Sequence, residues 1–247
     1  MVFFAAGSAQ GIKNPHAAPS GQQAESAARE GFLGVLMLDT RFPRPPGDIG
    51  NPATFAALGI PVRYLTVTGA SPMRVVREGD PTLLQPFVAA AHALAGQGAS
   101  LISTSCGFLA AFQADMAAAL EVPVVTSSLL QCADLDAPGV LTFDAQSLTP
   151  VLLRRAGVPP DTPLQGIPPG CEFHTRLLHN HDRLDLDEAE RNVVDAAREL
   201  VRRHPGVRTI VLECTNMPPY RAAIEAATGR PVRDIVTLLQ ASWRGPV

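Results

Sequence analysis

The chain has 247 residues, of which 46% are hydrophobic and 17% are charged. This composition is too apolar for a disordered protein and suffices to bury one large core or two smaller ones. The formal net charge is −3 and no basic stripe occurs, which argues against nucleic acid as a partner. No apolar run approaches the roughly 20 residues of a membrane span, and the first residues lack a signal-peptide pattern, so we expect a cytoplasmic protein.

Lysine occurs once, as Lys13, within a segment rich in Gly, Ser, Pro and Gln. Pyridoxal phosphate enzymes need a lysine buried at the site, and a P-loop needs a Gly-Lys pair, so the sequence argues against both classes. The four cysteines are spaced too widely for a zinc knuckle or a disulfide framework, and they fit a reducing compartment.

Residues 1–30 are small and polar without lasting periodicity, so we expect a flexible arm there. The rest of the chain alternates between short apolar runs and amphipathic segments. In the first half we expect strands at 34–39, 61–68, 99–103 and 122–125 and helices at 81–96 and 107–120. Asp80-Pro81 predicts the start of the first helix, because Asp is a good N-cap and proline suits the first helical position. Alternating strands and helices predict an α/β fold with parallel sheets.

The second half of the chain repeats the first. Residues 139–144 match residues 34–39 at an offset of 105 positions. In each half a glycine precedes a cysteine by 8 positions and a Pro-Val pair follows that cysteine by 17; the two cysteines are Cys106 and Cys214. Three matches in the same order predict a duplicated α/β unit. We expect two pseudo-symmetric domains, each with a small parallel sheet flanked by helices, and a ligand cleft between them.

Cys106 and Cys214 each stand where an apolar strand ends and a helix begins. Ligands of α/β proteins bind at this edge of the sheet. A helix N-terminus can lower the pKa of a thiol from about 8.5 to between roughly 3.5 and 7.5, which would make it a usable base. Two such thiols on opposite sides of a ligand can remove a proton from one face and return one to the other.

The remaining cysteines and two strand-end acids carry weaker signals. Cys132 and Cys171 have no repeat partner, and we interpret them as small buried hydrophobic residues. Asp39 and Asp144 also occupy matched strand ends, where Asp often serves as a turn residue. We take Asp39 and the adjacent Thr40 as candidate substrate-binding residues and Asp144 as structural.

Two motifs around the cysteines make the sequence resemble a known superfamily. Thr104-Ser105-Cys106-Gly107 and Glu213-Cys214-Thr215-Asn216, in duplicated halves of this length, resemble the aspartate/glutamate/hydantoin racemase superfamily over residues 31–247. Residues 39–52 resemble a short, less-studied branch of it. The resemblance implies a cofactor-independent enzyme with Cys106 and Cys214 as the acid/base pair. It also implies a discontinuous first domain, 31–126 plus 218–247, around a second domain, 127–217.

The motifs depart from the better-known members of that superfamily. Those carry Asn-Thr after the first cysteine and Thr-His or Thr-Glu after the second, where this chain has Gly107-Phe108 and Thr215-Asn216. We expect the substrate carboxylate, or the enediolate that develops from it, to be held by backbone N–H groups and small polar side chains. The candidates are Thr104, Ser105, Thr215 and Asn216.

The favoured function is racemisation or epimerisation of a small amino acid or amino-acid derivative, without pyridoxal phosphate or metal. Two other reactions remain open on the same scaffold: cis–trans isomerisation of a small unsaturated diacid and decarboxylation of a malonate. A non-catalytic protein that binds a small ligand is the alternative from a different class. The expected partner is a small-molecule carboxylate, and the assembly is either a monomer or a homodimer.

A second group of polar residues follows residue 170. Cys171, His174, His179 and His181 are donors that zinc accepts, together with the neighbouring Glu172. Histidines in a loop before a helix are more often solvated, so we expect no metal there.

Two arginines lie in the proline-rich loop after the first strand. Arg41 and Arg44 have the chemistry to clamp a carboxylate. Arginines in a loop of this composition are more often exposed to solvent, and we expect that of both.

Overall fold

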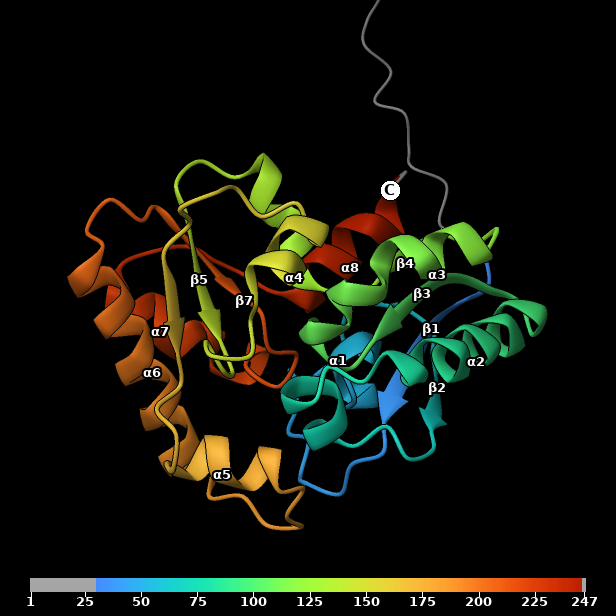
Figure 1. The fold of residues 1–247 in the computed structure, drawn as a ribbon, viewed down its shortest axis with the longest axis horizontal. Helices are drawn as coiled ribbons and strands as arrows, with labels where there is room; N and C mark the ends of the chain where they lie inside the picture. The colour runs from blue at the N-terminus through green and yellow to red at the C-terminus, as the bar shows by residue number, and fades with distance from the viewer. Residues whose placement is uncertain (1–29, 246–247) are drawn as a thin grey trace, which may run out of the picture.

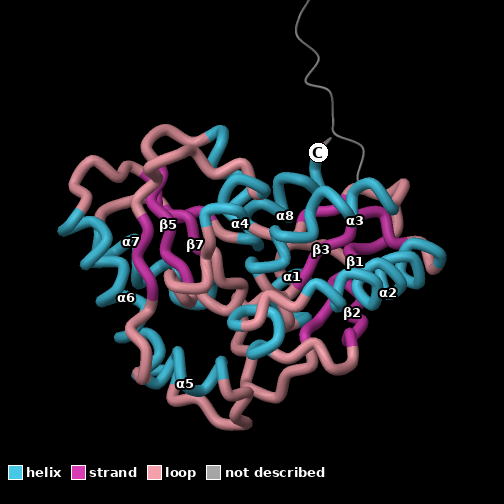
Figure 2. Tube along the Cα trace, viewed as in Figure 1, coloured by secondary structure: helices cyan, strands magenta, loops and turns pink. Residues whose placement is uncertain are grey.

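The computed structural model describes residues 30–245 of the protein. The expected N-terminal arm, 1–30, lies outside the described residues except for its last position. Two parallel four-stranded sheets lie side by side, each flanked by helices, as the α/β prediction required (Figure 1, Figure 2). No helix within residues 30–245 is long and apolar enough to cross a membrane.

The first sheet has the strand order β2-β1-β3-β4. Its strands are β1 (Phe32–Leu38), β2 (Val62–Val67), β3 (Ala99–Thr104) and β4 (Val124–Val125). Every residue of β1 is buried, as is typical of a central parallel strand covered on both faces. The helical segments of this half are α1 (Pro52–Ala56), η1 (Met73–Arg77), η2 (Pro81–Leu83), α2 (Leu84–Gly96), η3 (Gly107–Phe112), α3 (Gln113–Ala119) and η4 (Ser128–Asp134).

The second sheet has the order β6-β5-β7-β8. Its strands are β5 (Pro138–Thr142), β6 (Leu164–Gly166), β7 (Thr209–Leu212) and β8 (Val232–Arg233). The remaining helices are α4 (Pro150–Arg155), α5 (Glu172–Leu178), α6 (Leu186–Arg203), η5 (Pro218–Tyr220), α7 (Arg221–Thr228) and α8 (Ile235–Arg244). The long amphipathic helix α6 buries a stripe of small and aliphatic residues against this sheet and begins at Asp185, whose side chain accepts a hydrogen bond from the backbone N–H of Glu188.

The two sheets have equivalent topologies, which confirms the predicted duplication. β5, β6, β7 and β8 occupy the places of β1, β2, β3 and β4, and all pairings are parallel. The equivalent strands β3 and β7 end just before Cys106 and Cys214 respectively. The repeat therefore places one cysteine at the carboxyl edge of each sheet.

The chain returns to the first sheet later than position 218, where the sequence placed the boundary. Strand β8 pairs with β7 and helix α7 packs on α6, so residues 218–233 lie with the second sheet. Only α8 crosses back: Ile235, Leu239 and Trp243 join the core that contains Leu33 of β1. The reason is that the Pro-Val segment at 231–232 is the edge strand of the second sheet, as the one at 123–124 is of the first.

Candidate active site

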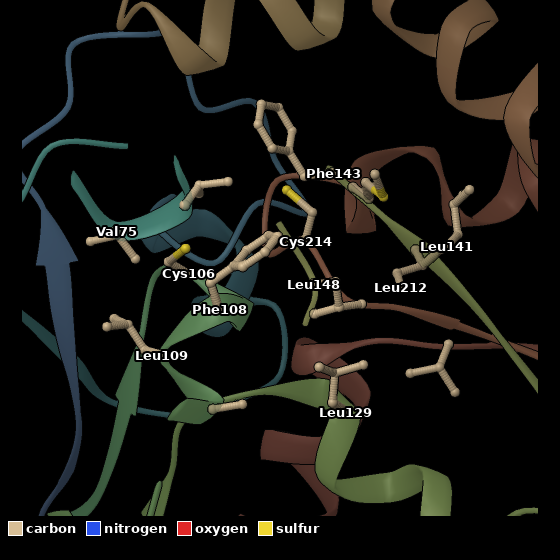
Figure 3. Packing of buried hydrophobic residues seen from close by; sticks show 14 of the residues in the cluster. Val75, Cys106, Phe108, Leu109, Leu129, Leu141, Phe143, Leu148, Leu212 and Cys214 are labelled. Carbon is tan, nitrogen blue, oxygen red and sulfur yellow. The ribbon is translucent and has the colours of Figure 1, made fainter. Parts of the chain in front are cut away.

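Cys106 and Cys214 line the same pocket at the junction of the two halves. In Figure 3 their side chains lie on either side of the Phe108 ring. Both residues are buried, with exposed fractions of 9% and 7%. The space between the pocket walls is small, with a volume of about 30 Å³.

Burial dominates the pKa of both thiols. It raises the pKa of Cys106 to about 12, although hydrogen bonds from the backbone N–H groups of Phe108 and Leu109 lower it. Burial likewise raises the pKa of Cys214 well above its usual value. The expectation that a helix N-terminus lowers these pKa values is therefore wrong for the closed pocket, because the loss of hydration outweighs the N–H groups.

The two sulfur atoms share one kind of hydrogen bond and differ in another. Cys106 accepts from the backbone N–H groups of Phe108 and Leu109, and Cys214 accepts from that of Asn216, contacts that favour the thiolate. The thiol of Cys214 also donates to Oδ1 of Asn216 at 3.6 Å, which favours the protonated form. The orientation of the Asn216 amide is fixed, because its Nδ2 donates to Oδ2 of Asp48 at 2.6 Å. Cys106 thus has one more backbone donor than Cys214, whereas the Cys214 thiol has a side-chain acceptor for its own proton.

Asp48 is the buried anchor of this arrangement. Its side chain is 1% exposed, and its Oδ1 lies 2.8 Å from NH1 of Arg44, whose side chain is 11% exposed. Arg44 also lies over the ring of Phe42, with 4.8 Å between its Cζ and the ring centroid. The expectation of an exposed Arg44 is therefore wrong, because its guanidinium pairs with the buried Asp48 carboxylate. Arg41 is exposed, as expected.

Glu213 also lines the pocket, although the sequence motif that contains it predicted no role for its side chain. It is 1% exposed, and its Oε2 accepts hydrogen bonds from the Thr142 hydroxyl at 2.8 Å and the Phe143 N–H at 3.2 Å. Its Oε1 has no hydrogen-bond partner within residues 30–245. Burial raises the pKa of this carboxyl to about 7. The sequence feature that could have pointed to Glu213 is its charge, since it directly precedes a cysteine at the end of a buried strand.

Gly107 leaves the space that Glu213 occupies. A Cβ atom at position 107 would lie 2.1 Å from the Glu213 carbonyl oxygen and 2.4 Å from its Oε1. The departure of this chain from the superfamily pattern after the first cysteine thus has a steric cause, since the Glu213 carboxyl fills the place of a side chain there.

We expect Gly107→Ala to destabilise the protein by about 1–3 kcal/mol, because backbone at Glu213 must shift to relieve the overlap. For a chain of this size that corresponds to a fall in melting temperature of roughly 2–10 °C, measured by thermal unfolding. Gly206→Ala is the matched control, because an added Cβ there meets nothing within 4 Å. An equal melting temperature for Gly107→Ala and Gly206→Ala would contradict the steric explanation.

Three of the other predicted substrate-binding residues line the pocket: Ser105, Thr215 and Asn216. The Ser105 hydroxyl accepts from the Leu38 N–H at 2.8 Å, which leaves its own O–H as a donor. The Thr215 hydroxyl donates to the Ser105 carbonyl at 2.7 Å and so joins the ends of β3 and β7. The structure brings these three together with the cysteines.

The remaining three do not line that pocket. Thr104 is fully buried, and its hydroxyl donates to the Thr126 carbonyl at 2.8 Å. Asp39 is exposed and accepts from the Gly69 N–H, and Thr40 accepts from NH2 of Arg44 at 2.9 Å. Their contacts are those of residues that hold strand ends and loops.

Asp144 and Asn180 tie the two halves together near the pocket. Asp144 forms an ion pair with Arg77 of η1 at 2.9 Å. Asn180, after α5, accepts from the Arg41 N–H at 2.6 Å and donates to the Asp39 carbonyl at 3.1 Å. These three links span the junction between the halves.

The residues considered for zinc are dispersed. His174 stacks on Phe143 with ring centroids 4.9 Å apart, and Nδ1 of His181 lies 2.9 Å from NH1 of Arg176. Across residues 30–245, no three His, Cys, Asp or Glu side chains are grouped as a metal site would require. Cys171 precedes α5 as its N-cap, and Cys132 is fully buried in the core.

Known structures with a similar fold include a decarboxylase and several racemases. Unliganded arylmalonate decarboxylase matches 87% of this chain and 93% of its own, with a TM-score of 0.55 and 17% identity. Allantoin racemase from Pseudomonas fluorescens matches 86% of this chain and 89% of its own, with a TM-score of 0.52 and 17% identity. At such identities the likeness shows the fold. The fold is thus the one expected from the resemblance of the paired cysteine motifs to the aspartate/glutamate/hydantoin racemase superfamily.

Closer sequence relatives narrow the assignment, although no family model matches the chain. A dimethylsulfoniopropionate lyase of Durusdinium sp. clade D is 30% identical over 228 residues, which cover 86% of this chain and 74% of that protein. Dimethylsulfoniopropionate lyase 3 of Emiliania huxleyi (strain CCMP1516) is 33% identical over 223 residues, 83% of this chain and 57% of that protein. The chain belongs to the family of these lyases, and it spans little more than half the length of the second relative.

Proposed function

We propose that the protein is a lyase that removes the proton next to a carboxylate and expels a leaving group from the β-carbon. With dimethylsulfoniopropionate, the α C–H bond breaks, its electron pair forms the C=C bond of acrylate, and the C–S bond breaks to release dimethyl sulfide. The abstracted proton remains on the base. The observation that carries the proposal is the pair of thiols in one closed pocket of a chain related to such lyases.

Cys106 is the base in this proposal, because its sulfur accepts from two backbone N–H groups and that of Cys214 from one. Its raised pKa must fall when the substrate binds. A sulfonium cation about 4 Å away stabilises a thiolate by roughly 4 kcal/mol at an effective dielectric constant near 20, equivalent to about 3 pKa units. As the cationic substrate binds, the Cys106 thiol therefore loses its proton to solvent, and the resulting thiolate takes the α-proton. Before binding, the residue stays uncharged.

The substrate carboxylate gains negative charge as the α-proton leaves. The Ser105 hydroxyl beside Cys106 and Cys214 is suited to stabilise it, because its own O–H remains as a donor. Donors fixed in a closed pocket act most strongly on charge that develops in the transition state.

Racemisation by the same residues is the second candidate, and the observation in its favour is the second cysteine. Elimination needs one base, whereas racemisation needs a group on each face of the substrate. The first step is common to both reactions. They differ in whether the carbanion loses a β-substituent or recovers a proton from Cys214.

The test is to incubate the purified protein with dimethylsulfoniopropionate and to quantify dimethyl sulfide and acrylate, which should form in equal amounts. A parallel incubation of amino acids and hydantoins in deuterated water tests for racemisation. Deuterium uptake without dimethyl sulfide would favour the second candidate. If the protein forms no dimethyl sulfide and exchanges no deuterium, both proposed reactions are contradicted. The remaining alternative is then a protein that only binds its ligand.

We expect lyase turnover to survive EDTA and hydroxylamine and to be lost on thiol alkylation, because the proposed chemistry is carried by Cys106. Alkylation should be slow, since both pocket thiols are buried. Loss of turnover with EDTA, restored by added metal, would show that a metal takes part.

A further inference from the structure

The carboxyl of Glu213 has no part in proton abstraction as proposed, yet it lines the pocket beside both thiols. Its Oε2 is satisfied, while its Oε1 lacks a partner within the described part of the chain and lies against Gly107. Burying a carboxyl oxygen without a hydrogen-bond or ionic partner costs free energy, unless a bound ligand supplies that partner. The feature therefore points to a ligand group that this oxygen would attract.

The walls around Glu213 limit the chemistry of that group. Phe108 follows Gly107 directly, Phe143 donates its backbone N–H to Glu213, and both phenylalanines line the same pocket as Glu213. In Figure 3 both rings lie close to the Cys214 side chain. Aromatic faces and a carboxylate together attract a cation even when it carries no N–H or O–H donor, as in a methylated onium group.

We propose that Glu213, Phe108 and Phe143 form the subsite for a methylated onium group carried on the β-carbon of the substrate. The assignment rests on the lyase function proposed above and names the substrate class that the site selects. In this subsite Glu213 is a specificity-determining residue. It pairs with the cation, while the apolar rings enclose the methyl groups and keep water away.

The subsite requires an ionised Glu213, which gives it a pH dependence. The pKa of about 7 means that the carboxyl gains its charge as the pH rises through neutrality, so onium affinity should rise over the same range. The other titratable or charged groups around it are Asp144 with its partner Arg77, Asp48 with its partner Arg44, Cys106, Cys214 and His174. Burial keeps the pKa of both cysteines above this range and lowers that of His174, which leaves Glu213 to change charge near pH 7.

The experiment compares two ligands of the same shape that differ only in charge. They are 3-(trimethylammonio)propanoate and 4,4-dimethylpentanoate, and their dissociation constants are measured by calorimetry for the full chain. At about pH 8 we expect the onium ligand to bind roughly 10- to 100-fold more tightly. At about pH 5.5 the preference should shrink to a few-fold, since Glu213 is then protonated.

Glu213→Gln keeps the shape of the side chain and removes its charge. In this variant the two ligands should bind with nearly equal affinity at both pH values, while the affinity for 4,4-dimethylpentanoate stays unchanged. The wild-type pH series tests the same point without any substitution. No preference in the wild type, a preference that persists in Glu213→Gln, or failure of both ligands to bind would overturn the proposal.

These measurements do not depend on turnover. A protein that prefers the onium ligand but releases no dimethyl sulfide would retain the subsite and refute the lyase function. A protein that releases dimethyl sulfide without any onium preference would refute the subsite alone.

Discussion

Replacing Cys106 by serine is expected to lower lyase turnover by about 10²- to 10⁴-fold, the usual contribution of a general base. A serine hydroxyl ionises far less readily than a thiol, so the nearby substrate cation cannot convert it into a base. The fold should survive, because oxygen is smaller than sulfur and the backbone donors at Phe108 and Leu109 remain. The readout is dimethyl sulfide release at saturating substrate.

Serine variants of two other cysteines provide the comparison for Cys106→Ser. Cys214→Ser should retain more elimination than Cys106→Ser, because its hydroxyl can still donate a hydrogen bond. It should abolish racemisation of any substrate, since that reaction must return a proton from the second face. Cys171→Ser is the matched control outside the pocket and should behave almost as the wild type. Near-normal turnover of Cys106→Ser would refute its role as the base.

Asp48→Ala is expected to lower the free energy of unfolding by about 3–5 kcal/mol, because it leaves the largely buried Arg44 without its partner. It also releases the Asn216 amide that accepts from the Cys214 thiol, so turnover should fall as well. Chemical denaturation with activity assays measures both effects. The exposed pair Arg198–Asp195 supplies the control: Asp195→Ala should cost at most about 1 kcal/mol. Equal losses in the two variants would contradict the buried anchor.

The internal repeat carried most of what the sequence could predict about the fold. Matched spacings around Cys106 and Cys214 predicted two equivalent sheets, and the strands on either side of α2, together with β5, lie close to their expected positions. Periodicity succeeds for such segments because buried strands and amphipathic helices are selected by long apolar patterns. Short elements such as β6 and α5 have no such pattern and were not predicted.

The domain boundary after the second cysteine could not be placed from local pattern alone. Helix α7 and strand β8 have the same appearance in either domain, and only pairing between distant strands assigns them to the second sheet. Helix α8 was also not predicted, although its Asp234 forms a capping box with Thr237. Tertiary contacts with β1 determine where this helix lies.

The site was predicted in part for the same reasons. The repeat identified Cys106 and Cys214, and their neighbours Ser105, Thr215 and Asn216 reach the pocket because they follow the same strand ends. Asp48 and Glu213 contribute through burial and through partners far apart in sequence, which no local motif records. The thiol pKa was misjudged because local N–H groups are visible in a sequence and desolvation is not.

The most direct test of the single-base account uses dimethylsulfoniopropionate labelled with deuterium at one of its two enantiotopic α-positions. If Cys106 alone takes the α-proton, one labelled enantiomer should give acrylate that retains all its deuterium and the other acrylate that retains none, as read by mass spectrometry. Cys214→Ser should show the same facial preference. Equal deuterium retention from both enantiomers, or a preference that reverses in Cys214→Ser, would contradict the account.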